Sequence, residues 1–236
     1  MGELIPIRSA RSQHLPAGGS CALDHPARRH GLIRLRRDPD EEGGGLSETA
    51  LVSLARDAVD LAASSALFDG IAAVSHARGL GVPLAALEQR LAEAHRRPGI
   101  RQAHVAVARS TAHAESLLEM LIWVRCQDFG LEPPEQQRIV RGGDGRDYRI
   151  DFAWQDGRLL LDADRRPERT AAAAAPGRPE RDVVAEEHRR EAAIRPACER
   201  LVLVSWSAAW NGQGMLRQLL ALGLPQRPRC PAGLTF

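Results

Sequence analysis

The segment Arg149–Arg166, RIDFAWQDGRLLLDADRR, constrains the fold more than any other, because two alternating runs flank one strong turn signal. The dipeptide Asp156-Gly157 favours a two-residue hairpin turn, since such turns need residues that tolerate positive φ. Gln155 then pairs with Arg158, and this pairing fixes the register of both strands. The chain is therefore predicted to contain a β-hairpin in which each residue has a defined partner.

In this register, one face of the hairpin carries only apolar side chains, and we expect that face to belong to a core. Its cross-strand pairs are Trp154 with Leu159, Phe152 with Leu161 and Ile150 with Ala163. The other face sets Asp151 opposite Asp162, with Cβ atoms about 5 Å apart, and Asp164 beside Arg149. Like charges opposite each other destabilise a sheet, so the acid pair, Asp151 and Asp162, needs a neutralising partner.

Two kinds of partner satisfy the acid pair. A divalent ion such as Mg²⁺ binds one or two carboxylates together with water. Alternatively, Asp164 pairs with Arg149, and Asp162 with Arg165 or Arg166, in a solvated acidic edge that does no chemistry. The hairpin alone leaves both interpretations open, and a third carboxylate from elsewhere in the chain would favour the metal.

The composition is that of a globular protein with one or two cores: 236 residues, 44% hydrophobic and 26% charged. Arginine and histidine supply every basic side chain, because the chain contains no lysine. The net charge of +2 is too small to indicate nucleic-acid binding by itself, although it is compatible with a local arginine-rich face.

The cysteines and the hydropathy pattern predict a soluble, cytoplasmic protein. Cys21, Cys126, Cys198 and Cys230 are scattered without a CxxC spacing, which argues against a zinc site or a disulfide framework. No apolar run reaches membrane-spanning length, and the first residues lack a signal-peptide core. We therefore expect no membrane partner.

Changes in composition and in hydrophobic periodicity divide the chain into four parts. Residues 1–45 are an irregular segment rich in Gly, Pro, Arg and His, and residues 46–110 have helical periodicity. Residues 111–225 have mixed α/β patterning, and 226–236 form a tail. In the helical part, Ser47 is the expected first cap, and Pro83 lies near the start of another helix.

The α/β part begins with an amphipathic helix. Ser116 stands three residues before Glu119, which predicts a capped N-terminus, and Gly130 predicts the helix end. After it come a strand, the hairpin, an Ala-rich insert, a charged helix, the strand LVLVSW and a final helix around Met215–Leu222. This order predicts an α/β (α+β) core, a mixed sheet flanked by helices, in which the last strand joins beside the hairpin.

Four stretches of this part resemble one known family. SLLEMLIWVRCQDFGLEPPEQQ, YRIDFAWQDGRLLLDAD, EEHRREAAI and LVLVSW together resemble actinobacterial PD-(D/E)xK nuclease-like proteins, relatives of the very-short-patch-repair endonucleases. The matching residues are Ser116, Glu119, Gly130, Leu131, Pro134, Asp151, Phe152, Ala153, Trp154, Asp162, Asp164, Glu187, Arg190, Glu191 and Trp206. The resemblance implies a restriction-endonuclease-like core whose last strand ends in Trp206.

The helical part has a resemblance of its own. VSLARDAVDLA is similar to the segment that precedes such domains in proteins with an AbiEi antitoxin of type IV toxin–antitoxin systems. Ser53, Ala55, Arg56, Asp60, Leu61 and Ala62 carry it, while Leu54 and Asp57 depart from it. Such relatives often begin with a DNA-binding winged helix-turn-helix. Residues 1–45 are too short and too rich in Pro and Gly for that element, so we expect a shortened N-terminal part.

The nuclease resemblance also implies a site. Glu119, Asp151 and Asp162 would bind Mg²⁺, which would polarise a phosphodiester and activate water, with Asp164 as a further or supporting ligand. His188 is the stand-in for the missing family lysine, because arginine does not act as a base. Arg165, Arg166, Arg189 and Arg190 would hold phosphate oxygens of DNA. In the alternative interpretation, without a metal or catalysis, Glu119 is a capping-box acid and His188 is a solvated histidine.

Three function classes follow. The first is a divalent-metal-dependent DNA endonuclease, whose activity is degraded by the missing lysine, by Arg165 in place of a family glycine, and by the shorter Asp162. The second is a non-catalytic DNA-associated regulator, or an antitoxin-like protein with a toxin partner, that keeps the nuclease fold. The third is a relict without function, which the Ala-rich insert permits. Metal binding discriminates the first class from the second.

Overall fold

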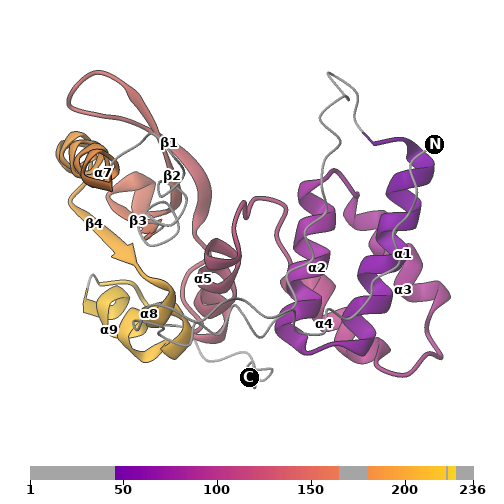
Figure 1. The fold of residues 1–236 in the computed structure, drawn as a ribbon. Helices are drawn as coiled ribbons and strands as arrows, with labels where there is room; N and C mark the ends of the chain where they lie inside the picture. The colour runs from indigo at the N-terminus through magenta and orange to yellow at the C-terminus, as the bar shows by residue number, and fades with distance from the viewer. Residues whose placement is uncertain (1–45, 165–179, 222, 227–236) are drawn as a thin grey trace, which may run out of the picture. The chain divides into compact units, whose positions relative to one another are not determined.

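A computed structural model describes residues 46–164, 180–221 and 223–226 of the chain, and these residues are the ones discussed below (Figure 1). The N-terminal segment, the Ala-rich insert and nearly all of the tail lie outside them. The described residues belong to one compact unit, in which helices precede a four-stranded mixed sheet. The predicted α/β class is therefore confirmed. No described helix has the length and apolar character needed to cross a bilayer.

The helical module comprises α1 (Glu48–Ser64), α2 (Leu67–Gly79), α3 (Leu84–Glu93) and α4 (Ile100–Arg109). Ser47 caps α1 as predicted, because its Oγ accepts the N–H of Ala50 at 3.3 Å. Helices α1 and α2 pack closely, since a Cβ on Gly70 would lie 2.9 Å from the Cα of Ala62. Small side chains at this crossing thus set the distance between the two helices.

Asp60, one of the residues of the AbiEi-like segment, ties α1 to its neighbours. Its Oδ1 accepts hydrogen bonds from Arg90 of α3 and from Arg97, which precedes α4. Nearby, Gly99 has a φ of 76°, and a Cβ there would lie 1.8 Å from the carbonyl oxygen of Ala63. The start of α4 therefore approaches α1 at a distance that only glycine permits.

Helix α5 (Leu117–Asp128) begins and ends where the sequence indicates. Ser116 Oγ accepts the N–H of Glu119 at 3.2 Å. At the other end, Gly130 has a φ of 63°, its N–H bonds Gln127, and the N–H of Leu131 bonds Cys126, each at 3.0 Å. This pattern is a Schellman motif, in which glycine supplies the left-handed residue that stops the helix.

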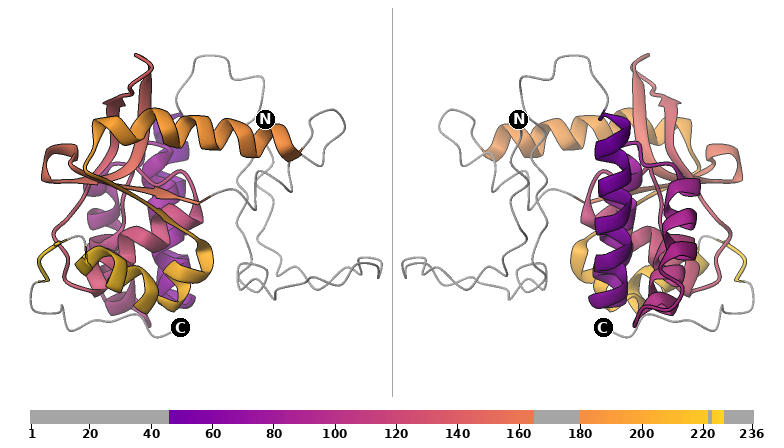
Figure 2. Two further views of the ribbon diagram at one scale, coloured as in Figure 1. Left: turned by 90° about the vertical axis from the view of Figure 1, so that its left-hand side faces the viewer. Right: turned by 90° about the vertical axis from the view of Figure 1, so that its right-hand side faces the viewer.

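The sheet has the order β1-β2-β3-β4, with strands β1 (Glu135–Arg141), β2 (Asp147–Trp154), β3 (Leu159–Ala163) and β4 (Arg200–Val204). The first three strands pair antiparallel, and β4 pairs parallel with β3. The crossover to β4 contains α7 (Glu180–Ile194), which lies on the opposite side of the sheet from α5 (Figures 1 and 2). The prediction that the last strand joins beside the hairpin is confirmed.

The hairpin has the predicted register. Phe152 pairs with Leu161 and Trp154 with Leu159. The turn places Asp156 at φ 55° and ψ 32° and Gly157 at φ 87°, and Arg158 N–H bonds the carbonyl of Gln155 at 3.1 Å. These values are those of a type I′ turn.

Both faces of the hairpin are buried. The side chains predicted for the apolar face are all buried, from Ile150 to Trp154 and from Leu159 to Ala163. Ile150 does not keep the predicted face, however, because it shares a core cluster with Ala153 and Leu160 of the other face. On the other face, Ala153 and Leu160 are each 1% exposed and share a core cluster with Ile194 of α7. The acid pair therefore lies in a covered sheet, unlike the solvated edge considered from the sequence.

The end of β4 differs from the expectation drawn from the resemblance. The strand ends at Val204, and Ser205 Oγ accepts the N–H of Ala208 at 3.3 Å, so Trp206 opens α8 (Trp206–Asn211) and does not end the strand. Helix α9 (Gln213–Ala221) follows and begins two residues before the predicted start. Trp206 stacks on Trp210 with ring centroids 5.9 Å apart.

Candidate acid site

Strands β2 and β3 diverge beyond the pair Phe152–Leu161, and there the carboxylates of the acid pair accept hydrogen bonds from backbone N–H groups. Asp162 Oδ1 accepts the N–H of Asp151 at 3.2 Å. Asp151 Oδ2 accepts the N–H of Ala163 at 2.9 Å. Each aspartate is only 5% exposed. The two acids thus lie next to each other inside the protein, at the place where the resemblance implies a metal.

Arg190 of α7 supplies the positive charge beside the acid pair. Its Nη1 contacts Asp162 Oδ2, and its Nη2 donates to the carbonyl oxygen of Arg149 at 2.8 Å. Glu187, one turn earlier, lies 3.6 Å from the same Nη1. One guanidinium therefore contacts both strands of the hairpin.

The electrostatics of Arg190 follow from this position. Burial lowers the pKa of its guanidinium, but the negative charges of Asp162, Glu187 and Asp151 outweigh that effect and raise the pKa above its usual value. Arg190 is therefore a permanent cation in the site. Sequence reasoning assigned it to DNA phosphates, whereas its side chain is 23% exposed and directed at the acids.

Glu119, the expected third metal ligand, serves the N-terminus of α5. It is fully buried. Its Oε2 accepts the N–H of Glu115 at 2.9 Å and the side-chain amide of Gln137 at 3.1 Å, and its Oε1 accepts the hydroxyl of Ser116 at 2.9 Å. Three hydrogen-bond donors thus contact this carboxylate in a capping arrangement.

Gln137 is a residue that sequence reasoning missed. The pairs Gln136 with Phe152 and Arg138 with Ile150 place it opposite Asp151. It has a φ of 56°, and its Oε1 is buried without a hydrogen-bond partner among the described residues. Positive φ is uncommon for glutamine, and no local sequence signal indicated it. Strained residues of this kind often occur at functional sites.

The donor set does not fit the divalent ion that the resemblance implies. Both carboxylate oxygens of Asp162 and one of Asp151 already accept hydrogen bonds, and Glu119 is engaged at a helix terminus. Within residues 46–164, 180–221 and 223–226, no three His, Cys, Asp or Glu side chains are grouped so that they could hold a metal ion. Arg190 supplies a positive charge from within the chain beside the acid pair.

The other predicted site residues lie around the acid pair. Asp164 follows β3 and is half-buried, with its N–H bonded to the carbonyl of Val204 at 2.9 Å. Arg149, its expected partner, pairs with Glu115.

The remaining candidates lie on α7 or outside the described residues. His188 is exposed on α7. Arg189 is also exposed, and its Nε donates to the carbonyl of Ala185 at 3.2 Å. Arg165 and Arg166 lie outside the described residues.

Two buried arginines, which the sequence does not distinguish from its many others, join the elements around α5. Arg109, the last residue of α4, donates to the carbonyl of Val124 at 3.0 Å and pairs with Asp128. Arg125 donates to the carbonyls of Ala209 and Trp210 at the C-terminal end of α8. Burial lowers the pKa of Arg125, and the charge of Asp128 acts in the opposite direction. These contacts position the helices around the sheet.

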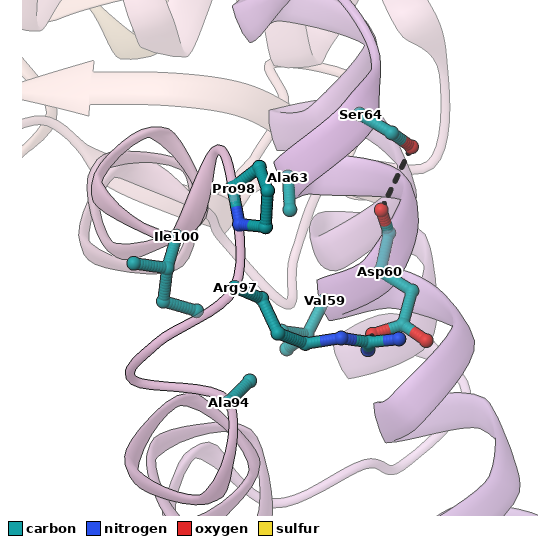
Figure 3. A pocket seen from close by; sticks show the side chains of 8 residues that line it. All are labelled: Val59, Asp60, Ala63, Ser64, Ala94, Arg97, Pro98 and Ile100. Atoms are coloured by element: carbon teal, nitrogen blue, oxygen red, sulfur yellow. Dashed lines mark hydrogen bonds and ion pairs between the residues drawn. The ribbon is translucent and has the colours of Figure 1, made fainter.

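A shallow pocket lies between α1 and the segment before α4 (Figure 3). The side chains of Asp60 and Arg97 point toward each other across it. Ser64 Oγ donates to the carbonyl oxygen of Asp60 at 2.8 Å. The polar groups of this pocket are thus paired with one another.

Compared with family models, curated proteins and solved structures, the chain matches none.

Proposed function

We propose that this protein is a DNA-associated regulator that keeps a PD-(D/E)xK-like core as a scaffold and does not cleave DNA. The observation that carries the proposal is the contact between Arg190 and Asp162. A guanidinium that is held by a buried carboxylate occupies one of the oxygens that a catalytic metal would need. The missing lysine supports the same conclusion, because arginine does not deprotonate a water molecule.

The spacing of the nuclease-like motifs supports the choice of scaffold. The order helix, three strands, helix, strand is compatible with these motifs, and Asp151 and Asp162 lie next to each other. The AbiEi-like segment favours one form of this proposal, an antitoxin-like role with a toxin as partner. In that segment Asp60 binds two arginines, which is a structural use of the motif.

Of the four arginines that the sequence assigned to DNA phosphates, Arg189 is the described one with an exposed side chain. It is exposed on α7 and has no acidic partner among the described residues, unlike Arg195, which pairs with Glu191. We expect Arg189→Gln to weaken binding to a duplex and to reduce its salt dependence, whereas Arg195→Gln has a smaller effect. Fluorescence anisotropy at several salt concentrations measures both variants. Equal binding by wild type and R189Q would remove this contact from the proposal.

The endonuclease is the competing function, and the position of two buried aspartates next to each other favours it. Incubation with supercoiled plasmid in Mg²⁺ or Mn²⁺ decides between the two. We expect no nicking by wild type beyond the level of an Asp151→Asn, Asp162→Asn double variant. Nicking that disappears with EDTA and in the double variant would establish the endonuclease and overturn the regulator.

A further inference from the structure

We infer that a basic surface of the helical module contacts the phosphates of duplex DNA. Its residues are His95, Arg96, Arg101 and His104. This inference rests on the proposed function, a DNA-associated regulator, and names the surface that the helical module contributes to it. No acidic residue occurs between Glu93 and Glu115, whereas four arginines and three histidines do.

The four arginines of this stretch fall into two groups. Arg109 is buried and pairs with Asp128, and Arg97 pairs with Asp60. The other two, Arg96 and Arg101, are exposed, and their side chains have no hydrogen bond or ion pair among the described residues. Their guanidiniums are therefore available to an anion from outside, and a phosphate group accepts the two parallel hydrogen bonds of a guanidinium.

The acids nearest to the basic surface along the chain and across it pair with other arginines. Asp60 of α1 accepts hydrogen bonds from Arg90 and Arg97, and Glu93 of α3 pairs with Arg90. These carboxylates therefore do not neutralise the two exposed arginines. The exposed acids of α1 and α3 that form no ion pair with them either are Glu48, Asp57 and Glu88.

The loop that carries the basic surface is fixed to α1. Arg97 points toward an aspartate of α1 (Figure 3), and Gly99 brings the backbone against that helix. The side-chain amide of Gln102 donates to the carbonyls of Ala62 at 2.8 Å and Ser65 at 2.6 Å. A binding loop that is already ordered loses little conformational entropy when its partner arrives.

The basic surface continues along α4. Arg101 and His104 are three residues apart, so their side chains lie on the same side of the helix, and both are exposed. His104 is a hydrogen-bond donor in either charge state. Ala108, one turn further, is also exposed and small, so it does not obstruct the approach of a nucleic-acid backbone.

A duplex suits this surface better than an acidic protein does. Contacts to phosphates need cations and hydrogen-bond donors, and they gain free energy from the release of counterions. Protein interfaces instead need buried apolar or aromatic anchors. None of the large hydrophobic side chains that are exposed among the described residues lies within residues 94–109.

Fluorescence anisotropy with a short labelled duplex of mixed sequence, at several salt concentrations, tests the inference. Arg96→Gln together with Arg101→Gln removes two phosphate contacts. We expect this double variant to bind about tenfold more weakly, and the slope of log Kd against log salt concentration to fall by about 2. Arg96→Lys with Arg101→Lys is expected to keep most of the affinity, because lysine also neutralises a phosphate as a point charge.

Two arginines of the α/β part provide a matched control. Arg200 and Arg217 are exposed, and their side chains also have no ion pair among the described residues. The R200Q/R217Q variant therefore removes the same charge as R96Q/R101Q from other places, and we expect it to change binding less. All these positions are exposed, so the Tm of each variant is expected to equal that of wild type.

The outcomes separate this inference from the proposed function. Binding by R96Q/R101Q that equals wild type, or that equals R200Q/R217Q, would overturn the basic surface and leave the proposed function standing. A lowered Tm of R96Q/R101Q would also overturn it, because the two arginines would then stabilise the fold. Displacement of the duplex by poly-glutamate at equal charge would make an acidic protein the partner. Failure of wild type to bind the duplex at all would overturn the proposed function itself.

Discussion

Glu119 illustrates how the neighbours of a residue decide its role. The resemblance assigned it to a metal, and the sequence also permitted a capping box. The carboxylate accepts hydrogen bonds at the N-terminus of α5, where the partial positive charge of the helix favours an anion. Both interpretations fitted the same spacing from Ser116, so only the three-dimensional structure separates them.

The first prediction concerns this carboxylate. Glu119→Gln removes the negative charge and leaves one side-chain oxygen as acceptor, so we expect a loss of about 1–2 kcal/mol in the free energy of unfolding. Urea denaturation measures the loss. Glu115→Gln is the control, because Glu115 is exposed and pairs with Arg149 at the surface. Equal stabilities of the two variants would contradict the capping role.

The sequence predicted part of the candidate site from residue patterns alone. The opposition of Asp151 and Asp162 followed from one turn dipeptide and a period of two. Their partner did not follow, because Arg190 lies 28 residues from Asp162 along the chain. The resemblance singled out Arg190 as a contact to DNA, and no pattern indicated its pairing with Asp162. The positive φ of Gln137 had no sequence signal either.

At the scale of elements, capping serines and glycine predicted helix ends correctly. Ser47, Ser116 and Gly130 marked helix ends that the structure confirms. Helix α8 was missed because six residues are too few to show a period of 3.6. The apolar run before it was therefore extended by two residues, to Trp206. A capping residue, here Ser205, indicates a short helix better than hydrophobic periodicity does.

The second prediction concerns the contact between α4 and α1. Gly99→Ala places a Cβ against the backbone of Ala63 and keeps a left-handed φ, so we expect a loss of about 2–4 kcal/mol. Gly81→Ala is the matched control, because Gly81 also has a positive φ but has open space around its missing Cβ. Its expected loss is about 1 kcal/mol. Thermal unfolding compares them, and equal losses would mean that the close approach is not required.

At the scale of the whole molecule, buried arginines hold the helical elements to the rest of the described unit. Arg109 of α4 donates to α5, and Arg125 of α5 donates to α8. Asp128 lies between the two guanidiniums. Phe68 of α2 meets Trp210 of α8 edge to face, with ring centroids 6.2 Å apart. The sequence predicted the class and order of these elements, but not these contacts, which join residues far apart in the chain.

The third prediction tests this linkage. Arg109→Met leaves Asp128 with one of its two guanidinium partners, and breaking a buried ion pair from one side costs about 3–5 kcal/mol. We expect a loss of that size in urea denaturation followed by tryptophan fluorescence, since Trp123 donates to the carbonyl of Arg109. Arg101→Met on the same helix is exposed and serves as control. A loss below about 1 kcal/mol for R109M would show that the linkage does not stabilise the fold.

The parallel pairing of β3 with β4 has a consequence for the order of folding. The hairpin of β2 and β3 closes locally, so the two aspartates meet as soon as it forms. Arg190 follows 28 residues after Asp162, and β4 follows later still. On a growing chain the two negative charges are thus brought together before Arg190 has been synthesised. We therefore expect the hairpin to become stable only when α7 docks, which couples closure of the sheet to synthesis of its last helices.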